Sequence, residues 1–279
     1  MAIRDVLLTL ASYPDPTPVS VIDDAVSFAS ALGAHIAAIS CETHVEVPGS
    51  LLGGSLGHVG GFVAAEARKS REAAQGLLAA FQSSAKKAGL SFETVLEKCR
   101  SHEVSSLLVD YARLRDLTIA SVPASYGPRY AEAIIFGSGR PTLVLPETPR
   151  KKLFELRTAV VAWDFSRAAA RAVADAVPLL EKAIAVRIVT VENEKLLGSK
   201  HSAEALAAIL ARHGIEVVVD RIDAAGRPIG EVLEAAAASC AADVLVMGAY
   251  GHSRFREFVL GGATRSLLSK PPLPILFSH

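Results

Sequence analysis

The chain has 279 residues, which is the length of two ordinary domains that can each bury a hydrophobic core. Half of its residues (51%) are apolar and 21% are charged, a composition that argues against disorder. Its 29 basic residues balance its 29 acidic residues, so no net charge draws it to nucleic acid or to an anionic membrane, and we expect neither as a partner.

We expect a soluble, cytoplasmic protein. Residues 1–14 contain no basic leader, long apolar stretch or small-residue cleavage site. The most apolar helix-length window, Val232–Tyr250, contains two acidic residues and predicts a buried helix followed by a strand. Three scattered cysteines, Cys41, Cys99 and Cys240, form no C-x-x-C pair, which is typical of buried thiols in a reducing compartment.

The first half begins with strands that alternate with helices. The apolar run Ile3–Ala11 predicts a buried strand, Val19–Leu32 predicts a helix, and His35–Ser40 predicts a second strand. The segment that follows, Thr43–Ala88, is about 25 residues longer than its counterpart in the second half and contains the glycine-rich run Leu51–Gly61. These glycines have the backbone freedom to cradle an anion, but no clear strand-to-helix junction brackets them, which favours a flexible surface loop.

The first half ends with a helix and two further strands. The helix has an apolar face that begins at Val104, and the strands are Asp116–Ser121 and a proline-led segment that starts at Pro141. Prolines and charges then interrupt the apolar pattern between residues 146 and 155. We expect this segment to join a first domain, residues 1–147, to a second domain, residues 155–279.

The second half repeats this order. Leu156–Asp164 predicts a first strand, Ser166–Leu180 an amphipathic helix, and Val186–Val191 a second strand. A helix that begins at Ile229 repeats the apolar spacing of the earlier one, and the aspartate-led strand Asp243–Gly248 follows it. Such an internal repeat predicts an α/β fold of two tandem doubly wound, Rossmann-like units with parallel sheets.

A glycine-rich loop follows the penultimate strand of the second half. Two residues separate Gly248 from Gly251, and nine more precede Gly261. Glycines let backbone N–H groups approach phosphate oxygens, and the free N–H groups of the helix that begins near Gly261 attract negative charge. The loop follows the carboxyl end of a strand, where open α/β sheets bind ligands. The residues expected to hold a polyphosphate are Gly248, Gly251, Ser253, Arg254, Gly261, Gly262, Ala263 and Thr264.

This glycine spacing resembles the ATP-binding signature of universal stress proteins, G-x-x-G, nine residues, then G and a serine or threonine. The resemblance implies an ATP-binding regulator of the stress response, with magnesium accompanying the phosphates. It further implies that Asp164 faces the adenosine and that Val191 lies where the family contacts adenine through its backbone. Gly262 departs from the signature, and the missing hydroxyl donor is worth about 1 kcal/mol, or up to about tenfold in affinity.

We expect the first half to bind no nucleotide. Ser121 and Ala124 stand in the places of Gly248 and Gly251, and the loop after Ser121 is about six residues shorter. Ala11 stands where the second half has its aspartate. We expect this half to pack on the second as an intramolecular pseudo-dimer, and a homodimer of the whole chain is a further partner that the sequence leaves open.

Two other functions remain open at this stage. One is an interaction or dimerisation module of the same fold without nucleotide, in which Asp164 only caps the helix Ser166–Leu180. The other is an enzyme that acts on a nucleotide-like molecule, but no candidate base stands near the loop, so we expect at most slow ATP hydrolysis. Trp163 is expected to fill core or an interface rather than to stack on adenine. The eight histidines have no close metal-ligand spacing and predict no metal site.

Overall fold

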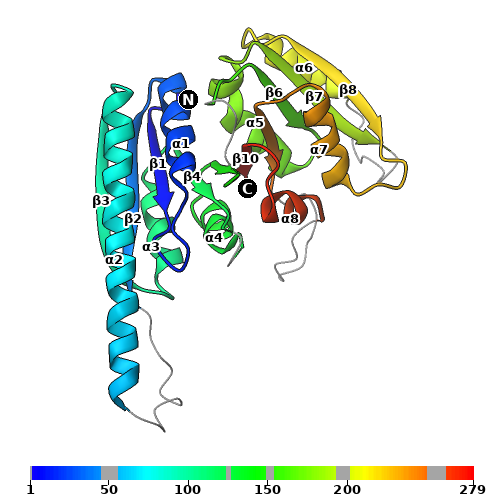
Figure 1. The fold of residues 1–279 in the computed structure, drawn as a ribbon. Helices are drawn as coiled ribbons and strands as arrows, with labels where there is room; N and C mark the ends of the chain where they lie inside the picture. Colours follow the sequence, from blue (N-terminus) through cyan, green and yellow to red (C-terminus); the bar gives the residue numbers. More distant parts are fainter. Residues whose placement is uncertain (1, 45–55, 124–126, 149–153, 193–201, 250–261) are drawn as a thin grey trace.

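The structure is a computed structural model in which residues 2–44, 56–123, 127–148, 154–192, 202–249 and 262–279 are described. Within these ranges ten strands form a single sheet of order β3-β2-β1-β4-β5-β10-β9-β6-β7-β8, and eight helices accompany it (Figure 1). The predicted α/β class and the doubly wound arrangement of each half are confirmed.

Each half contributes five strands and four helices in the same chain order. The elements of the first half are β1 (Asp5–Leu10), α1 (Val19–Leu32), β2 (His35–His44), α2 (Leu56–Lys87), β3 (Phe92–Arg100), α3 (Val104–Arg113), β4 (Leu117–Ser121), α4 (Arg129–Gly137) and β5 (Thr142–Leu145). Those of the second half are β6 (Thr158–Ala162), α5 (Arg167–Leu180), β7 (Ala185–Glu192), α6 (Ala203–Ala211), β8 (Val217–Asp223), α7 (Ile229–Ser239), β9 (Val244–Gly248), α8 (Gly262–Ser269) and β10 (Ile275–Ser278).

The two halves meet where β5 pairs with β10. This pairing is antiparallel, with Val144 opposite Ile275 and Thr142 opposite Phe277, whereas the other strand pairs of the sheet are parallel. Strand order therefore runs outward from this junction in the same way on both sides. The repeat in the sequence becomes one continuous sheet with related halves.

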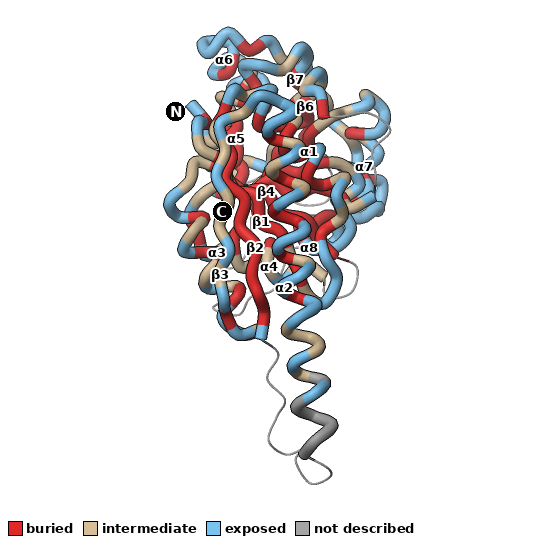
Figure 2. The backbone as a smooth tube through the Cα atoms, turned by 60° about the vertical axis from the view of Figure 1, so that its left-hand side comes forward, coloured by how far each residue is buried: buried red, intermediate tan, exposed pale blue. Residues whose placement is uncertain are grey.

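The central strands are buried on both faces, as parallel strands covered by helices must be. In β1, Val6 and Leu8 join the apolar cluster that includes residues of α1, whereas Leu7 joins the cluster that includes residues of α3. Figure 2 shows this core as a continuous buried band through β1, β2 and β4. Such burial explains why these strands are apolar runs rather than alternating sequences.

The aspartate that precedes β4 and β9 ties each of these strands to its neighbour. A carboxylate oxygen of Asp116 accepts hydrogen bonds from the backbone N–H groups of Arg4 and Asp5, at 2.9 and 3.1 Å. Asp243 accepts from the backbone of Arg157 and Thr158 in the same way, at 2.9 Å each. The repeated aspartate therefore has a structural role at the amino edge of the sheet, far from the predicted site.

The interpretation of Leu51–Gly61 as a flexible surface loop is wrong for its last six residues. Helix α2 begins at Leu56 and includes Gly57, Gly60 and Gly61, while residues 51–55 lie outside the described part. Alanine, glutamate, lysine and arginine favour a helix over residues 64–87, and each residue added to an existing helix gains a hydrogen bond, which offsets the low propensity of glycine. Figure 1 shows that α2 extends well beyond the end of the sheet. No helix in the described ranges is both long enough and apolar enough to cross a membrane.

Candidate functional site

The carboxyl ends of β6, β7 and β9 meet at one edge of the second half. Strand β6 lies between the other two: after β6 the chain continues to β7 on one side, and after β9 it continues to β10 on the other. Asp164 follows β6, Val191 lies near the end of β7, and Gly248 ends β9. The structure thus places these three predicted residues at the topological switch point, where open α/β sheets bind ligands. Predicted site residues Gly251, Ser253, Arg254 and Gly261 lie outside the described part.

Gly248 has a packing role of its own. A Cβ atom at this position would lie 2.5 Å from the carbonyl carbon of Ala168 and 2.5 Å from the amide nitrogen of Ala169. Both atoms belong to the backbone of the first turn of α5, which has no room to move away. Glycine is therefore required here whether or not a ligand binds, and it brings the end of β9 directly against the start of α5.

Asp164 does not cap α5. The N-cap is Ser166, whose hydroxyl oxygen accepts a hydrogen bond from the amide of Ala169 at 3.0 Å. One oxygen of Asp164 accepts from the amide of Ser166 at 2.9 Å, and its other oxygen accepts no hydrogen bond from any described residue. The side chain is exposed at the edge of the sheet. The helix-cap interpretation of Asp164 is therefore wrong, and an exposed carboxylate oxygen remains for a ligand.

Two buried polar atoms beside Asp164 have no hydrogen-bond partner. Ala162 and Val189 are paired in the sheet, so the residues that follow them, Trp163 and Thr190, lie next to each other at its edge. Thr190 is only 4% exposed, and neither its hydroxyl nor the indole N–H of Trp163 makes a hydrogen bond. As expected, Trp163 packs against the core, with its ring edge-to-face on Phe165 at 5.2 Å.

The first half satisfies the matching hydroxyl. Ser40 is paired with Leu10, just as Thr190 is adjacent to Trp163. The hydroxyl of Ser40 donates to the carbonyl of Leu10 at 2.9 Å. A buried polar group without a partner costs about 1–3 kcal/mol. The second half therefore contains an unmet hydrogen-bonding group at a position where the first half has none.

Helix α8 follows the glycine-rich loop and begins with an exposed glycine. Gly262 is exposed, and a Cβ atom there would meet no other atom within 4 Å. Ala263 is half-buried, and Thr264 is 4% exposed, so its hydroxyl lies inside the fold rather than on the surface. The helix packs on α7 through Ser266 and the backbone of Ala263, both of which lie close to Gly230. Of this turn, Gly262 is therefore the residue that is open to a ligand.

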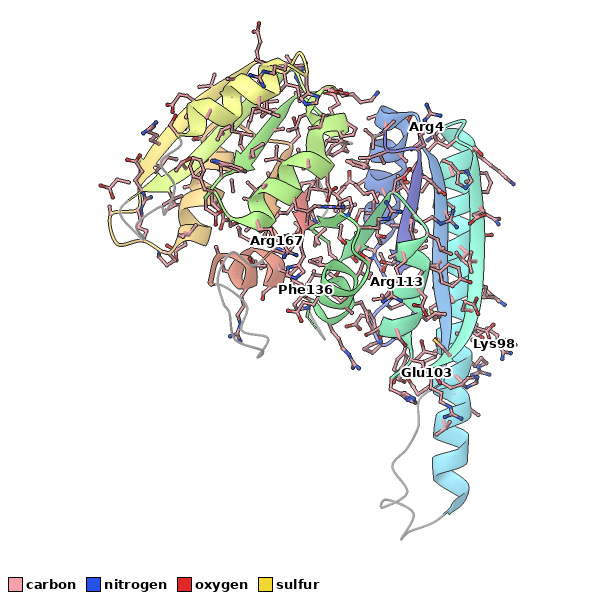
Figure 3. The ribbon with its side chains drawn as sticks, turned by 180° about the vertical axis from the view of Figure 1, so that it is seen from behind. Arg4, Lys98, Glu103, Arg113, Phe136 and Arg167 are labelled. Carbon is pink, nitrogen blue, oxygen red and sulfur yellow. The ribbon has the colours of Figure 1, made fainter. Side chains whose placement is uncertain are left out.

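Sequence reasoning missed Arg167. It is the first residue of α5, its side chain is exposed, and among the described residues it has no hydrogen-bond or ion-pair partner. Its neighbours Ala168 and Ala169 lie against Gly248, and Figure 3 labels Arg167 at the start of α5. A cation is disfavoured in the first turn of a helix because the macrodipole is positive there. An unpaired arginine at such a position is a signal that points to an anionic partner.

The matching edge of the first half is closed by α2. Ser70 of this helix is fully buried, and its hydroxyl oxygen accepts a hydrogen bond from the amide of Thr43 at 2.8 Å and lies 3.0 Å from the hydroxyl of Ser12. These contacts hold α2 over the ends of β1 and β2. The cavity that remains has a volume of about 20 Å³, enough for one water molecule. Burial raises the pKa of the Cys41 thiol that lines it, so this thiol stays protonated at neutral pH.

A carboxylate lies at the end of β4, where the second half has Gly248. The hydroxyl of Ser121 donates to Oε1 of Glu147 at 3.0 Å. Burial raises the pKa of the Glu147 carboxyl, the hydrogen bond from Ser121 lowers it, and the nearby charge of Asp15 raises it further. The end of β4 thus has a carboxylate beside it, whereas the end of β9 lies against the start of α5, next to Arg167.

The likeness to known proteins agrees with this geometry. Residues 155–279 match the sequence profile of the Universal stress protein family. A universal stress protein from Archaeoglobus fulgidus DSM 4304 is similar over 98% of this chain and 95% of its own, with a TM-score of 0.70 and 16% identity. A functionally unknown protein from Pseudomonas aeruginosa PAO1 is similar over 99% of this chain and 92% of its own, with a TM-score of 0.59 and 15% identity.

At these identities, the two solved structures show the fold alone. No match is found among curated proteins. The family profile covers the half of the chain that contains Asp164, Arg167 and α8. Residues 155–279 are therefore a domain of the universal stress protein family, and the chain as a whole has the tandem fold of a universal stress protein of its own length.

Proposed function

We propose that this protein is a cytoplasmic, ATP-binding regulator of the stress response that holds nucleotide in its second half only. The observation that carries the proposal is the contrast between the two related edges of the sheet. In the first half, α2 and Glu147 occupy the edge, and hydrogen bonds from the amide of Thr43 to Ser70 and from Ser121 to Glu147 hold them there. In the second, the Thr190 hydroxyl is buried without a partner, and Arg167 has none among the described residues. Unmet hydrogen-bonding and charged groups at a switch point are what a bound ligand would satisfy.

The adenosine end of the ligand would lie at β6 and β7. The exposed carboxylate oxygen of Asp164 suits the hydroxyl groups of a ribose, because an ionised carboxylate accepts hydrogen bonds only. The backbone of Val191 would contact adenine, and Thr190 lies directly before it in the same strand. A nucleoside fits this edge better than a simple anion does, since the carboxylate of Asp164 accepts hydrogen bonds from hydroxyl groups but repels an anion.

The phosphates would lie at the root of the glycine-rich loop and at the start of α8. Backbone N–H groups of Gly248, Gly261, Gly262 and Ala263 would donate to phosphate oxygens, as helix starts and glycine-rich loops do. Gly251, Ser253 and Arg254 would complete the loop, with Thr264 beside it. Bound magnesium would neutralise part of the phosphate charge. Arg167 would supply a cation on the opposite side, next to the segment at which β9 ends.

ATP binding would regulate the protein rather than lead to ATP hydrolysis. Among the described residues at this edge, His279 donates to the carbonyl of Ala249 and Glu192 pairs with Arg221, so we expect any hydrolysis to be slow. Nucleotide can shift the packing of the two halves as a pseudo-dimer, or of two chains as a homodimer, only if it binds one arrangement more tightly than the other. A regulator of this kind needs differential affinity and no chemistry.

A matched pair of substitutions tests the proposal. Gly251→Glu places a carboxylate in the phosphate loop, and Ala124→Glu places the same charge at the corresponding position of the first half. Isothermal titration calorimetry should find ATP binding abolished by Gly251→Glu and unchanged by Ala124→Glu. Equal ATP affinity in both variants would remove the phosphate-loop assignment. Absence of ATP binding by the unmodified protein would favour the nucleotide-free interaction module instead.

A further inference from the structure

The end of the chain lies directly against the root of the phosphate loop. Ala249, the residue after Gly248, is fully buried, and its amide donates to the carbonyl of Ser278 at 2.7 Å. Nδ1 of His279 lies 3.0 Å from the carbonyl oxygen of Ala249, so it donates to that oxygen. Both backbone groups of Ala249 are thus held by the last two residues of the second half.

The ring of His279 also touches the first half. It packs edge-to-face on Phe136 of α4, with the ring centres 5.1 Å apart and the ring planes at 82°. Figure 3 shows Phe136 on the side of α4 next to α8. The side chain that holds the carbonyl of Ala249 is therefore itself supported by the half that is proposed to bind no nucleotide.

The other side of the loop root is fixed as well. Gly248 lies against the backbone of Ala168 and Ala169 so closely that no Cβ atom fits between them. Gly248 and Ala249 are consequently clamped between α5 on one side and the pair Phe136–His279 on the other. Backbone donors bind phosphate well only within a few tenths of an ångström of the correct distance, so a displacement of Gly248 would weaken its bond to a phosphate held there.

We propose that Phe136 and His279 are positioning residues, through which the first half holds Gly248 and Ala249, the described residues from which the phosphate loop starts, in place for nucleotide binding. This inference rests on the proposed function. It gives the nucleotide-free half a physical role, because the ring contact is made across the junction between the halves. It also makes nucleotide binding and the packing of the halves reciprocal: whatever alters the ring contact alters ATP affinity, and ATP strengthens the contact by the same factor.

Two substitutions on one helix separate this role from general stability. Phe136→Ala removes the ring contact, and Tyr130→Ala removes a ring of the same helix that packs inside the first half. Calorimetry should find ATP binding about fivefold weaker in Phe136→Ala and unchanged in Tyr130→Ala, although both lower the unfolding midpoint. Phe136→Tyr keeps the ring and should restore affinity, and Phe136→Leu replaces Phe136→Ala if that variant fails to fold. Equal affinities in all of these variants would overturn the inference.

A measurement without ligand keeps the inference separate from the proposed function. Hydrogen–deuterium exchange of the Ala249 amide in the nucleotide-free protein should be at least about tenfold faster in Phe136→Ala and in His279→Ala than in Tyr130→Ala. The double variant Phe136→Ala/His279→Ala should exchange no faster than the faster single variant, because the two residues act as one unit. Unchanged exchange at Ala249 would overturn the inference. Failure of the unmodified protein to bind ATP would refute the proposed function alone.

Discussion

Replacing Thr190 by valine should make the protein more stable and its nucleotide binding weaker. Valine has nearly the shape of threonine and the same β-branched preference for a strand, so the substitution removes one hydroxyl and little else. That hydroxyl belongs to a side chain only 4% exposed and has no hydrogen-bond partner. Most substitutions of buried residues destabilise a protein, so an increase in stability would be a distinctive result.

The size of both effects follows from the unmet hydrogen bond. An unsatisfied buried hydroxyl costs about 1–3 kcal/mol, so Thr190→Val should raise the free energy of unfolding by about 1 kcal/mol, or the unfolding midpoint by about 2–4 °C. If the ligand satisfies the hydroxyl, the variant loses a neutral hydrogen bond worth about 1 kcal/mol in the complex. ATP should then bind about fivefold more weakly.

Ser40→Ala is the matched control in the first half. Its hydroxyl lies at the corresponding position but donates to the carbonyl of Leu10 at 2.9 Å, so its removal should lower stability by about 1 kcal/mol. Urea unfolding of both variants, with and without saturating ATP, measures the two effects together. Trp163, the single tryptophan of the chain, lies next to Thr190. A change in its fluorescence should therefore report ATP binding.

Two outcomes would refute the reasoning. If Thr190→Val destabilises the protein as Ser40→Ala does, the Thr190 hydroxyl has a partner in the folded state and is not held for a ligand. If Thr190→Val stabilises the protein but leaves ATP affinity unchanged, the hydroxyl is unmet yet does not touch the nucleotide.

Three further substitutions probe charge and hydroxyl groups at the two edges. Gly262→Ser should tighten ATP binding by about tenfold in calorimetry, because it supplies a donor to a charged phosphate and its Cβ atom meets no other atom within 4 Å; unchanged affinity would mean that the phosphates lie elsewhere. Arg167→Gln should weaken ATP binding about threefold to tenfold at low salt, and less at high salt because exposed charges are screened. Arg157→Gln, at the opposite end of the strands, is the control and should have no effect. A loss of affinity that does not depend on salt would contradict an ionic role for Arg167. Glu147→Gln should stabilise the protein at pH 7 in urea unfolding. Because the pKa of Glu147 is raised in the folded state, the stability that this carboxyl contributes is present below its unfolded pKa and is lost as pH rises through its folded pKa. The stability gained by Glu147→Gln should therefore vanish near about pH 4. A gain in stability that does not depend on pH would show that the charge of Glu147 is not its cause.

The alternation and repetition of strands and helices made most of the fold predictable. The bounds of α1 match the predicted Val19–Leu32, and α5 begins one residue after the predicted Ser166, because Ser166 is its N-cap. The pairing of β5 with β10 was not predictable in detail. Thr142–Leu145 and Ile275–Ser278 are four-residue strands buried on both faces, so no polar alternation indicates their partner or register.

The glycine run at the start of α2 shows a limit of local reasoning. Glycines favour loops by their own propensity, but the helix-forming residues that follow them carry the helix back to Leu56. The extension has a consequence for function, since the same helix holds Ser70 over the edge of the first half. Composition alone contains no signal for this contact, because it depends on where a residue of α2 lands on the sheet.

The positions of the described candidate residues were predictable from the sequence, but the hydrogen bonding of their neighbours was not. The glycine spacing indicated Gly248, the family resemblance indicated Asp164 and Val191, and all three lie at the carboxyl ends of neighbouring strands. The unmet hydroxyl of Thr190 depends on which neighbours come within hydrogen-bond distance, which only coordinates reveal. Gly248 gained a second explanation, because its contact with α5 requires glycine without any ligand. The assignment of the phosphate loop thus rests less on that glycine than on the unmet groups around it.

The central claim is that one of the two related edges holds a nucleotide and the other does not. Native mass spectrometry of the intact protein, titrated with ATP and magnesium, counts the nucleotides bound to each chain. We expect a single ATP per chain at saturation in the unmodified protein and in Ala124→Glu, and none in Gly251→Glu. Two nucleotides per chain, or one that persists in Gly251→Glu, would contradict the account.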